Sequence, residues 1–266
     1  MLEAERYGDV TQIRMSRVMD GKPLYWVAAY LVDDVLIDSG CEYTKGELLD
    51  FLRDKAVTKV VNTHYHEDHI GANALLQRAL GVKLYASATA LDALRHPPQM
   101  MPYEELVWGN PEPSVAQPLD EHVITSRRTL HVIPTPGHTA AHVCFFEPMH
   151  GWLFTGDLYV TDDMKVCRPD ENQWQIVESL RRMRKLWPNV LFSATGSIVP
   201  DATGALDRRI AFLENVGQTA HQLHSRGLDP EEIVLKIFGR ESSLQQMTQG
   251  HYSCVNLVRS FLGCVG

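Results

Sequence analysis

Val60-Val61-Asn62-Thr63-His64-Tyr65-His66-Glu67-Asp68-His69-Ile70-Gly71 carries three histidines and an aspartate within six residues. Residues 58–61 predict the end of a short buried strand, and residues 71–77 open a helix rich in strong helix formers. The histidines therefore lie in the turn between a strand and a helix, where the backbone can direct their ring nitrogens inward. We interpret this turn as a metal site.

The spacing of these side chains has a chemical meaning. In an extended segment, residues two apart share a face, so His64 and His66 can bind one cation together. Asp68 and His69 follow where the chain turns, and they can face a second cation beside the first. Imidazole and carboxylate ligands suit zinc, iron or manganese, and zinc lowers the pKa of a bound water to about 7. The alternative, a solvated histidine-rich turn, has no need for this regular spacing.

Composition sets the frame around this turn. The chain has 266 residues, of which 44% are apolar, so it can bury a large core as one domain or as one domain with a small extension. The net charge is −8 and the basic residues are scattered. Their densest group, at residues 181–185, has the spacing of a solvent-facing helix side, so we expect no nucleic-acid partner.

The first 20 residues and the cysteines indicate where the protein is located. Residues 1–20 contain no apolar segment of the kind that signal peptides or membrane spans need, which predicts a cytoplasmic protein without membrane contact. An odd number of widely spaced cysteines predicts free thiols rather than a disulfide framework. These cysteines are Cys41, Cys144, Cys167, Cys254 and Cys264. We expect a small-molecule substrate as the partner, and the sequence leaves a homodimer open.

The segment before the histidines predicts antiparallel strands. Residues 10–18, 24–32 and 35–37 are apolar, aromatic or β-branched and are separated by turns. A helix at residues 46–56 returns the chain to the strand that carries the histidines. Asp38 ends the third strand, and two readings stay open for it: a hydrogen-bond partner of a ligating histidine, or an aspartate that caps a turn.

Residues 96–118 form a long stretch rich in proline, methionine and aromatic side chains. Such a loop inside a compact domain favours a lid or a binding loop, and an inert surface excursion is the alternative. If the loop is functional, its apolar side chains predict a partly apolar substrate.

Two later strand ends repeat the pattern of a polar side chain in a tight loop. A strand at residues 130–133 leads into Pro136-Gly137-His138, and an apolar strand leads into Thr155-Gly156-Asp157. A single loop histidine is more often a bystander than a ligand. A carboxylate such as Asp157, however, can bridge two cations, as a two-metal site requires.

Taken together, these motifs resemble the metallo-β-lactamase superfamily of hydrolases. The resemblance rests on His64-x-His66-x-Asp68-His69, the Pro-Gly-His138 loop and Thr-Gly-Asp157 in that order, and it covers about the first two thirds of the chain. It implies a mixed α/β (α+β) fold in which two β-sheets are covered by helices on both outer faces, a four-layer αββα sandwich.

The resemblance also implies ligand roles. His64, His66 and His138 would hold a first metal, and Asp68 and His69 a second. Asp157 would bridge them, and the metal would be zinc, with iron or manganese open. In this class, a metal-bound hydroxide attacks a carbonyl while Asp68 or Asp157 relays a proton to the leaving group.

From residue 172 onward the chain is predicted to be helical, at 173–186, 204–225, 230–238 and 252–262. The last helices resemble the C-terminal extensions of glyoxalase II-like relatives, which wall the substrate cleft. We therefore divide the chain into a metal-binding core at 1–203 and a helical extension at 204–266 that packs on it.

The sequence departs from the family pattern at one place. Relatives carry a further histidine in a strand-end loop after the bridging aspartate, but residues 191–199 here contain none. His251 is a candidate replacement, and its alternative reading is a capping or core histidine. The second metal position could also be weak or empty, so a mononuclear site stays open.

The predicted activity is hydrolysis of an ester, thioester or lactone of a small carbonyl substrate. Tyr159 would donate to the oxyanion, unless it simply packs in the core. A mononuclear iron persulfide dioxygenase of the same fold is the main alternative. A phosphodiesterase or nuclease would need a basic groove, which the sequence lacks. A non-enzymatic module is disfavoured by the intact set of metal-ligating side chains.

Overall fold

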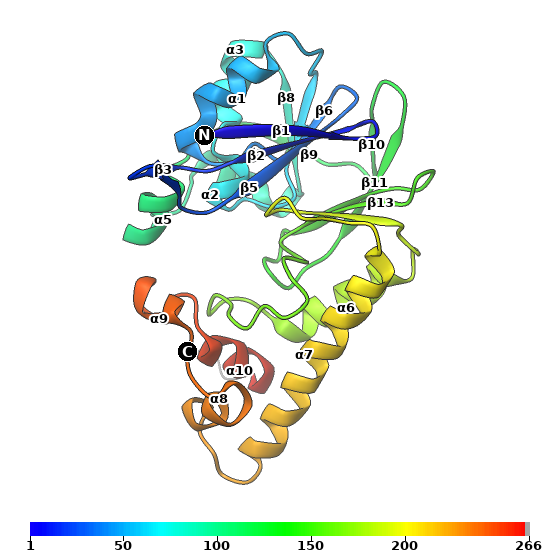
Figure 1. Cartoon of the computed structure of the whole chain (residues 1–266). Helices are drawn as coiled ribbons and strands as arrows, with labels where there is room; N and C mark the ends of the chain where they lie inside the picture. Colours follow the sequence, from blue (N-terminus) through cyan, green and yellow to red (C-terminus); the bar gives the residue numbers. More distant parts are fainter. Residues whose placement is uncertain (264–266) are drawn as a thin grey trace.

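The computed structural model describes residues 1–263, which form two β-sheets packed face to face between helices (Figure 1). The four-layer αββα architecture with C-terminal helices is therefore confirmed. The first sheet has seven strands, in the order β1 (Leu2–Tyr7), β2 (Val10–Met15), β5 (Val27–Val32), β6 (Val35–Ile37), β7 (Lys59–Val61), β8 (Lys83–Ala86) and β9 (Ala116–Pro118). The second sheet has six, in the order β10 (His122–Ile124), β11 (Thr129–Pro134), β12 (Val143–Glu147), β13 (Trp152–Gly156), β14 (Val190–Ser193) and β15 (Ile198–Val199).

Every residue of β5 is buried because this strand has core on both faces. Side chains alternate across a strand, so Val27, Ala29 and Leu31 pack toward the outer helices. Ala28 and Tyr30 point the other way, into the core between the sheets. There the Tyr30 hydroxyl donates to the carbonyl of Ser193 at 2.6 Å and ties the two sheets together.

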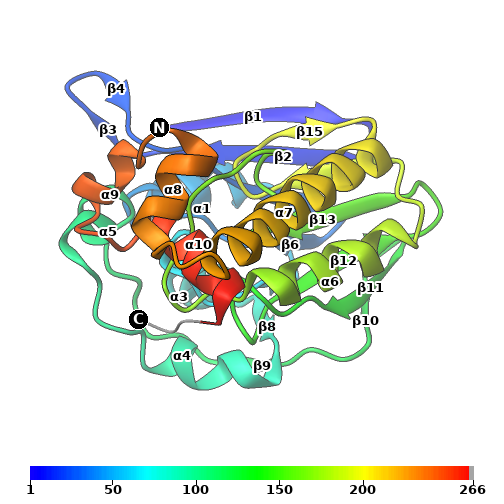
Figure 2. The ribbon, with the colours of Figure 1, turned by 90° about the horizontal axis from the view of Figure 1, so that it is seen from below.

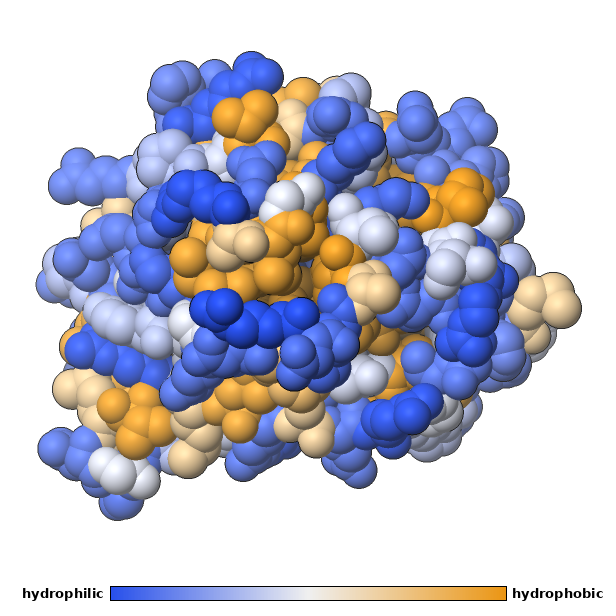
Figure 3. All heavy atoms as spheres, turned by 90° about the horizontal axis from the view of Figure 1, so that it is seen from above, coloured by the Kyte–Doolittle hydropathy of each residue, from blue (hydrophilic) through white to orange (hydrophobic). Residues whose placement is uncertain are grey.

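Helices cover both outer faces of the sandwich (Figure 1). The first sheet carries α1 (Lys45–Leu52) and α3 (Asn73–Leu80), and this face shows mostly hydrophilic side chains around smaller apolar areas (Figure 3). The second sheet carries α6 (Gln173–Arg184) and α7 (Ala202–His224). The short elements on the first-sheet side are η1 (Glu42–Thr44), α2 (Glu67–Ile70), η2 (Ala88–Ala90), α4 (Leu91–Arg95), α5 (Pro102–Val107) and the ribbon of β3 (Val18–Met19) and β4 (Lys22–Pro23).

The C-terminal helices are α8 (Pro230–Phe238), α9 (Ser243–Met247) and α10 (Cys254–Leu262). Of these helices, α8 and α10 pack on α7, and α10 also packs on α6 (Figure 2). Asp229 caps α8 by accepting from the amide of Glu232, whose side chain accepts in return from the amide of Asp229. The helix α7 begins two residues before the proposed boundary at 203/204 because the Asp201 side chain caps it. The division into core and extension itself stays a proposal.

Residues 96–118 are not the continuous loop that the sequence predicted. They contain the helix α5 and the edge strand β9. Pro102 occupies the first turn of α5, and the Glu104 carboxylate accepts from the amide of Met101 at 2.8 Å, which closes the start of the helix. The sequence analysis also missed the strand β1, because most of its side chains are exposed and it has no buried apolar face.

The cysteines that the structure describes, Cys41, Cys144, Cys167 and Cys254, are free and buried. The remaining predicted thiol, Cys264, lies outside the described residues.

Gly71 offers a test of the packing around the histidine turn. A Cβ atom there would lie 2.3 Å from the backbone of Cys41 and of Glu42, which cannot move cheaply. We expect Gly71→Ala to lower the free energy of unfolding by about 1–3 kcal/mol in urea denaturation. Gly46→Ala is the matched control, because nothing lies within 4 Å of its Cβ position in α1, and it should be neutral or slightly stabilising. Equal stabilities for the two variants would contradict this packing.

Candidate metal centre

Strand topology brings the predicted ligands to one edge of the sandwich. The strands β6, β7 and β8 run parallel, so the residues after their carboxyl ends meet. In the other sheet β13 and β14 are also parallel, and Asp157 directly follows β13. The amide of Val143, at the start of β12, donates to the carbonyl of Thr63 at 2.8 Å and joins the two edges.

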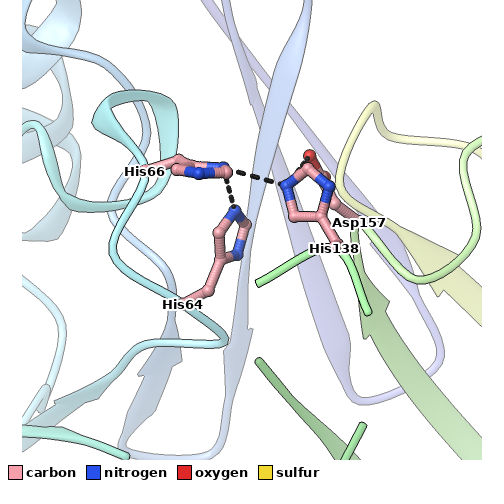
Figure 4. Close-up of side chains that lie close together, drawn as sticks. All are labelled: His64, His66, His138 and Asp157. Atoms are coloured by element: carbon pink, nitrogen blue, oxygen red, sulfur yellow. Dashed lines mark hydrogen bonds and ion pairs between the residues drawn. The ribbon is translucent and has the colours of Figure 1, made fainter. Parts of the chain in front are cut away.

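Three histidines form the first group of ligand atoms (Figure 4). His64 Nε2 lies 3.0 Å from His66 Nδ1, which lies 2.9 Å from His138 Nε2. Together with a carboxylate oxygen of Asp157, these atoms all lie within 4.8 Å of one another. Ring nitrogens that face each other in this way can all serve as acceptors only if they share a cation. The group can hold a metal ion.

A second group adjoins the first. His69 Nε2 lies 3.3 Å from Asp157 Oδ1 and 3.7 Å from Asp68 Oδ2. It is buried and has no hydrogen-bond partner among residues 1–263. Its other nitrogen, Nδ1, lies 2.8 Å from the Asp38 carboxylate, which makes Nδ1 the donor and leaves the Nε2 lone pair free. A buried lone pair between two carboxylates fits a divalent cation.

Asp38 is therefore a hydrogen-bond partner of His69, which is one of the two roles that the sequence left open for it. Its carboxylate also accepts from the amide and the hydroxyl of Thr63, both at 2.8 Å. It lies at the end of β6 with a φ of 58°, a left-handed conformation that aspartate tolerates better than most residues.

Electrostatics agree with this assignment. Burial lowers the pKa of His64 and of His66 well below the usual range, which keeps both imidazoles neutral. Burial also opposes protonation of His69, but the neighbouring carboxylates, that of Asp68 first, outweigh it and raise its pKa. Burial raises the pKa of Asp68. Buried carboxylates and lone pairs held this close need a positive charge, and a divalent cation supplies it.

Two residues that the sequence analysis missed orient this centre. Glu171 Oε1 lies 3.4 Å from His138 Nδ1, so it directs the other ring nitrogen toward the cluster. His142 Nε2 accepts from the amide of Asp157 at 3.2 Å, while its Nδ1 lies 2.8 Å from the Thr135 hydroxyl. Mainly through burial, the pKa of His142 falls to about 3. No sequence signal marks either residue, because each contacts a residue far away in the sequence: Glu171 contacts His138, and His142 contacts Asp157.

The two tentative residues lie elsewhere. The Tyr159 hydroxyl donates to Asp162 at 2.5 Å, and its ring packs beside α6 and α7. His251 Nδ1 lies 2.7 Å from the Tyr103 hydroxyl and 3.5 Å from Glu104. Neither belongs to the group of side chains among residues 1–263 that could hold a metal ion. The strand-end loop after β14, where the family resemblance predicted a histidine, instead contributes Ala194 and Thr195 to the wall of a cavity.

This cavity has a volume of about 240 Å³, and Asp68 and Asp157 lie in its wall. The remaining wall is largely apolar and comes from the loop before β5, from α5, and from α9 with the residues after it. These residues are Leu24, Tyr25, Val27, Tyr103, Leu106, Val107, Trp108, Leu244, Met247, Thr248 and Tyr252. Part of the predicted binding loop, the helix α5 and Trp108, therefore borders the candidate site, so a substrate can reach the carboxylates along apolar surface.

Arg168 connects the ligand turn to this wall. It is 6% exposed, and its guanidinium lies 2.9 Å from Glu67 and 3.4 Å from Glu104 of α5. Its Nε donates to the Tyr252 hydroxyl at 2.8 Å. Burial raises the pKa of Glu67 to about 7, although Arg168 opposes the shift. A buried arginine needs such partners, and it fixes the segments that supply them.

The fold and the site define a class: an αββα sandwich with a histidine and aspartate centre able to hold metal ions. The metallo-beta-lactamase superfamily model matches residues 27–195, and the chain belongs to that superfamily.

Similar proteins agree with this assignment. The hydroxyacylglutathione hydrolase of Bdellovibrio bacteriovorus is 29% identical over 164 residues, which cover 60% of this chain and 57% of that relative. The lactamase-like protein nscB of Trichophyton rubrum is 26% identical over 254 residues, 84% of this chain and 71% of that protein. A crystal structure of a beta-lactamase domain protein from Burkholderia ambifaria is similar in fold, with a TM-score of 0.75, 20% identity, and coverage of 98% of this chain and 88% of that one.

Within residues 1–263, no helix combines the length and apolar character needed to cross a membrane.

Asp38→Asn tests the orientation of His69. An asparagine can still accept from the Thr63 amide, but its own amide would face His69 Nδ1–H, and the histidine would have to move its proton to Nε2. We expect metal affinity to fall about 10- to 100-fold, measured by competition with a chelator. Asp50→Asn, on the exposed side of α1, is the control and should leave affinity unchanged. An unchanged affinity in a folded Asp38→Asn protein would contradict the assignment.

Proposed function

We propose that this protein is a metal-dependent hydrolase that cleaves an ester, thioester or lactone of a small carbonyl substrate. One observation carries the proposal: two adjoining groups of ligand atoms, with Asp157 between them, lie beside a largely apolar cavity. Polarising charge beside a sheltered place for an apolar group suits the hydrolysis of carbonyl compounds that carry such a group.

In this proposal His64, His66 and His138 hold the first ion. Asp68 and His69 hold the second, and Asp157 lies between them. Bound divalent ions would supply Lewis acidity and water activation there. Zinc is the proposed metal because neutral imidazoles and carboxylates suit it, with iron and manganese as alternatives.

The chain's own residues would handle the substrate. Asp68 and Asp157 lie in the cavity wall, where either carboxylate can carry a proton to the leaving group. The Tyr252 hydroxyl accepts from Arg168, and no acceptor for its own proton is found among residues 1–263. That proton is free to be donated to the substrate oxygen as negative charge develops. The hydroxyl of Tyr159 is already engaged with Asp162, which favours Tyr252 as the donor.

The relatives support a thioester as one substrate type. The relatives named hydroxyacylglutathione hydrolase act on a thioester. The match to the first of them, however, covers only 57% of that relative's length. The missing histidine after β14 keeps the mononuclear iron persulfide dioxygenase as a second candidate, since Ala194 and Thr195 offer poor ligands there.

Location and assembly stay predictions. The buried free thiols of the described residues suit a reducing compartment, so we retain the cytoplasm as the proposed location. A homodimer stays open.

Metal content with a substrate panel tests the proposed function. We expect about two zinc or manganese ions per chain by elemental analysis of freshly purified protein, and hydrolysis of at least one ester, thioester or lactone. Removal of the metal by a chelator should abolish turnover, and readdition should restore it. One iron per chain with oxidation of a persulfide would instead establish the second candidate.

Tyr252→Phe tests the proposed donor. Loss of this hydroxyl should lower kcat about 100-fold, with KM and metal content little changed, because the hydrogen bond strengthens only in the transition state. Tyr159→Phe is the informative comparison. A large fall in kcat for Tyr159→Phe alone would return the donor role to the residue chosen from the sequence.

A further inference from the structure

We infer that the site selects uncharged substrates with an apolar chain or ring next to the carbonyl or on the leaving group, rather than thioesters of an anionic thiol such as glutathione. This rests on the proposed hydrolase function and adds the substrate class. It comes from the walls of the cavity, which differ in chemistry from the metal centre.

Aromatic side chains form a continuous surface along one wall. The rings of Tyr25 and Trp108 meet edge to face at 5.7 Å, and those of Trp108 and Tyr103 at 6.2 Å. Tyr103 continues to Tyr252, with ring centroids 6.3 Å apart. Edge-to-face contacts hold each ring in place, so the wall presents a fixed apolar surface to a ligand.

The helix α9 supplies apolar side chains to the same cavity, and Figure 1 shows α5 and α9 on the same side of the molecule. Leu24, Leu106 and Met247 are 40%, 46% and 70% exposed, respectively. Apolar side chains from three separate segments that stay in water around one opening mark a binding surface for an apolar group.

No lysine or arginine lines this cavity among residues 1–263. Two cations on neighbouring segments are engaged elsewhere. Arg168 is paired with Glu67 and Glu104, and the Arg17 guanidinium donates to the carbonyl of Leu106 and stacks on the ring of Tyr43.

Glutathione carries carboxylates at a distance from its thioester carbonyl. Those carboxylates would have to leave water beside aromatic and aliphatic side chains with no cation to receive them, which is costly. An uncharged chain or ring meets no such cost and gains from burial, at about 25 cal/mol per Å² of apolar surface. The wall therefore favours the uncharged substrate by its composition alone.

The segments that set this preference lie partly outside the region shared with the family. The family match covers residues 27–195, whereas Leu24, Tyr25 and the side chains of α9 lie beyond it. The substrate class is thus set by wall residues that the family match alone does not determine.

Two thioesters of the same acyl group test the inference. The metal-loaded protein is assayed with the 3-phenylpropionyl thioester of N-acetylcysteamine, which is uncharged, and with that of glutathione. We expect kcat/KM to be at least about tenfold higher for the uncharged thioester. Equal or faster cleavage of the glutathione thioester would overturn the inference and leave the hydrolase function standing. Cleavage of neither, nor of any ester or lactone in the panel, would remove the hydrolase function itself.

A charge added to the wall tests its location. Leu244→Lys places an ammonium on α9 at the cavity, and it should raise the relative kcat/KM for the glutathione thioester about threefold. Leu235→Lys is the matched control, an exposed leucine on α8 that does not line the cavity, and the ratio should stay at its original value. An equal ratio in both variants would show that α9 does not border the bound substrate and would overturn its part in the selection.

Discussion

The buried carboxylate of Asp38 is the constraint on which the centre depends. It is 3% exposed, so it must find hydrogen-bond donors within the protein, and it finds them in the amide and hydroxyl of Thr63 and in His69 Nδ1. Those contacts join the ends of two parallel strands, and they also set the tautomer of His69, a candidate ligand. His69 can therefore offer only Nε2 to the candidate centre. The carboxylates of Asp68 and Asp157 lie near that atom, where they can share a cation with it.

The opposite sheet is held to this edge by an equally restrictive contact. Gly156 has a φ of 48°, and a Cβ atom there would lie 2.7 Å from His142 Nε2 and 2.8 Å from Thr63. The chain can therefore bring Asp157 this close only through a glycine that accepts a left-handed conformation. His142 then accepts from the amide of Asp157, so the carboxylate is delivered by backbone geometry rather than by a flexible side chain.

The sequence predicted the fold and the candidate ligands because their signals are local. His64, His66, Asp68 and His69 share one turn, so their spacing identified them as candidates. His138 and Asp157 each follow a glycine near a strand end, and the family resemblance implied their roles. The partners of these residues could not be predicted in this way. Glu171 lies 33 positions from His138, and nothing in its segment indicates that contact. Asp38 lies 31 positions from His69, and its place at a strand end left its role open between a histidine partner and a turn cap. The helix α5 was not predicted because the prolines around it indicate a loop, although one of them, Pro102, begins the helix.

Arg168 explains why the cavity wall and the candidate metal centre belong to one structure. A buried guanidinium without partners would destabilise the fold, so the chain must bring carboxylates to it. One comes from Glu67, inside the histidine turn, and one from Glu104 in α5, while Tyr252 reaches it from the C-terminal segment. A shift of α5 would therefore take the Glu104 carboxylate away from Arg168, which lies beside the histidine turn. The position of the wall is therefore set by the same buried charge that supports the turn carrying His64, His66 and His69.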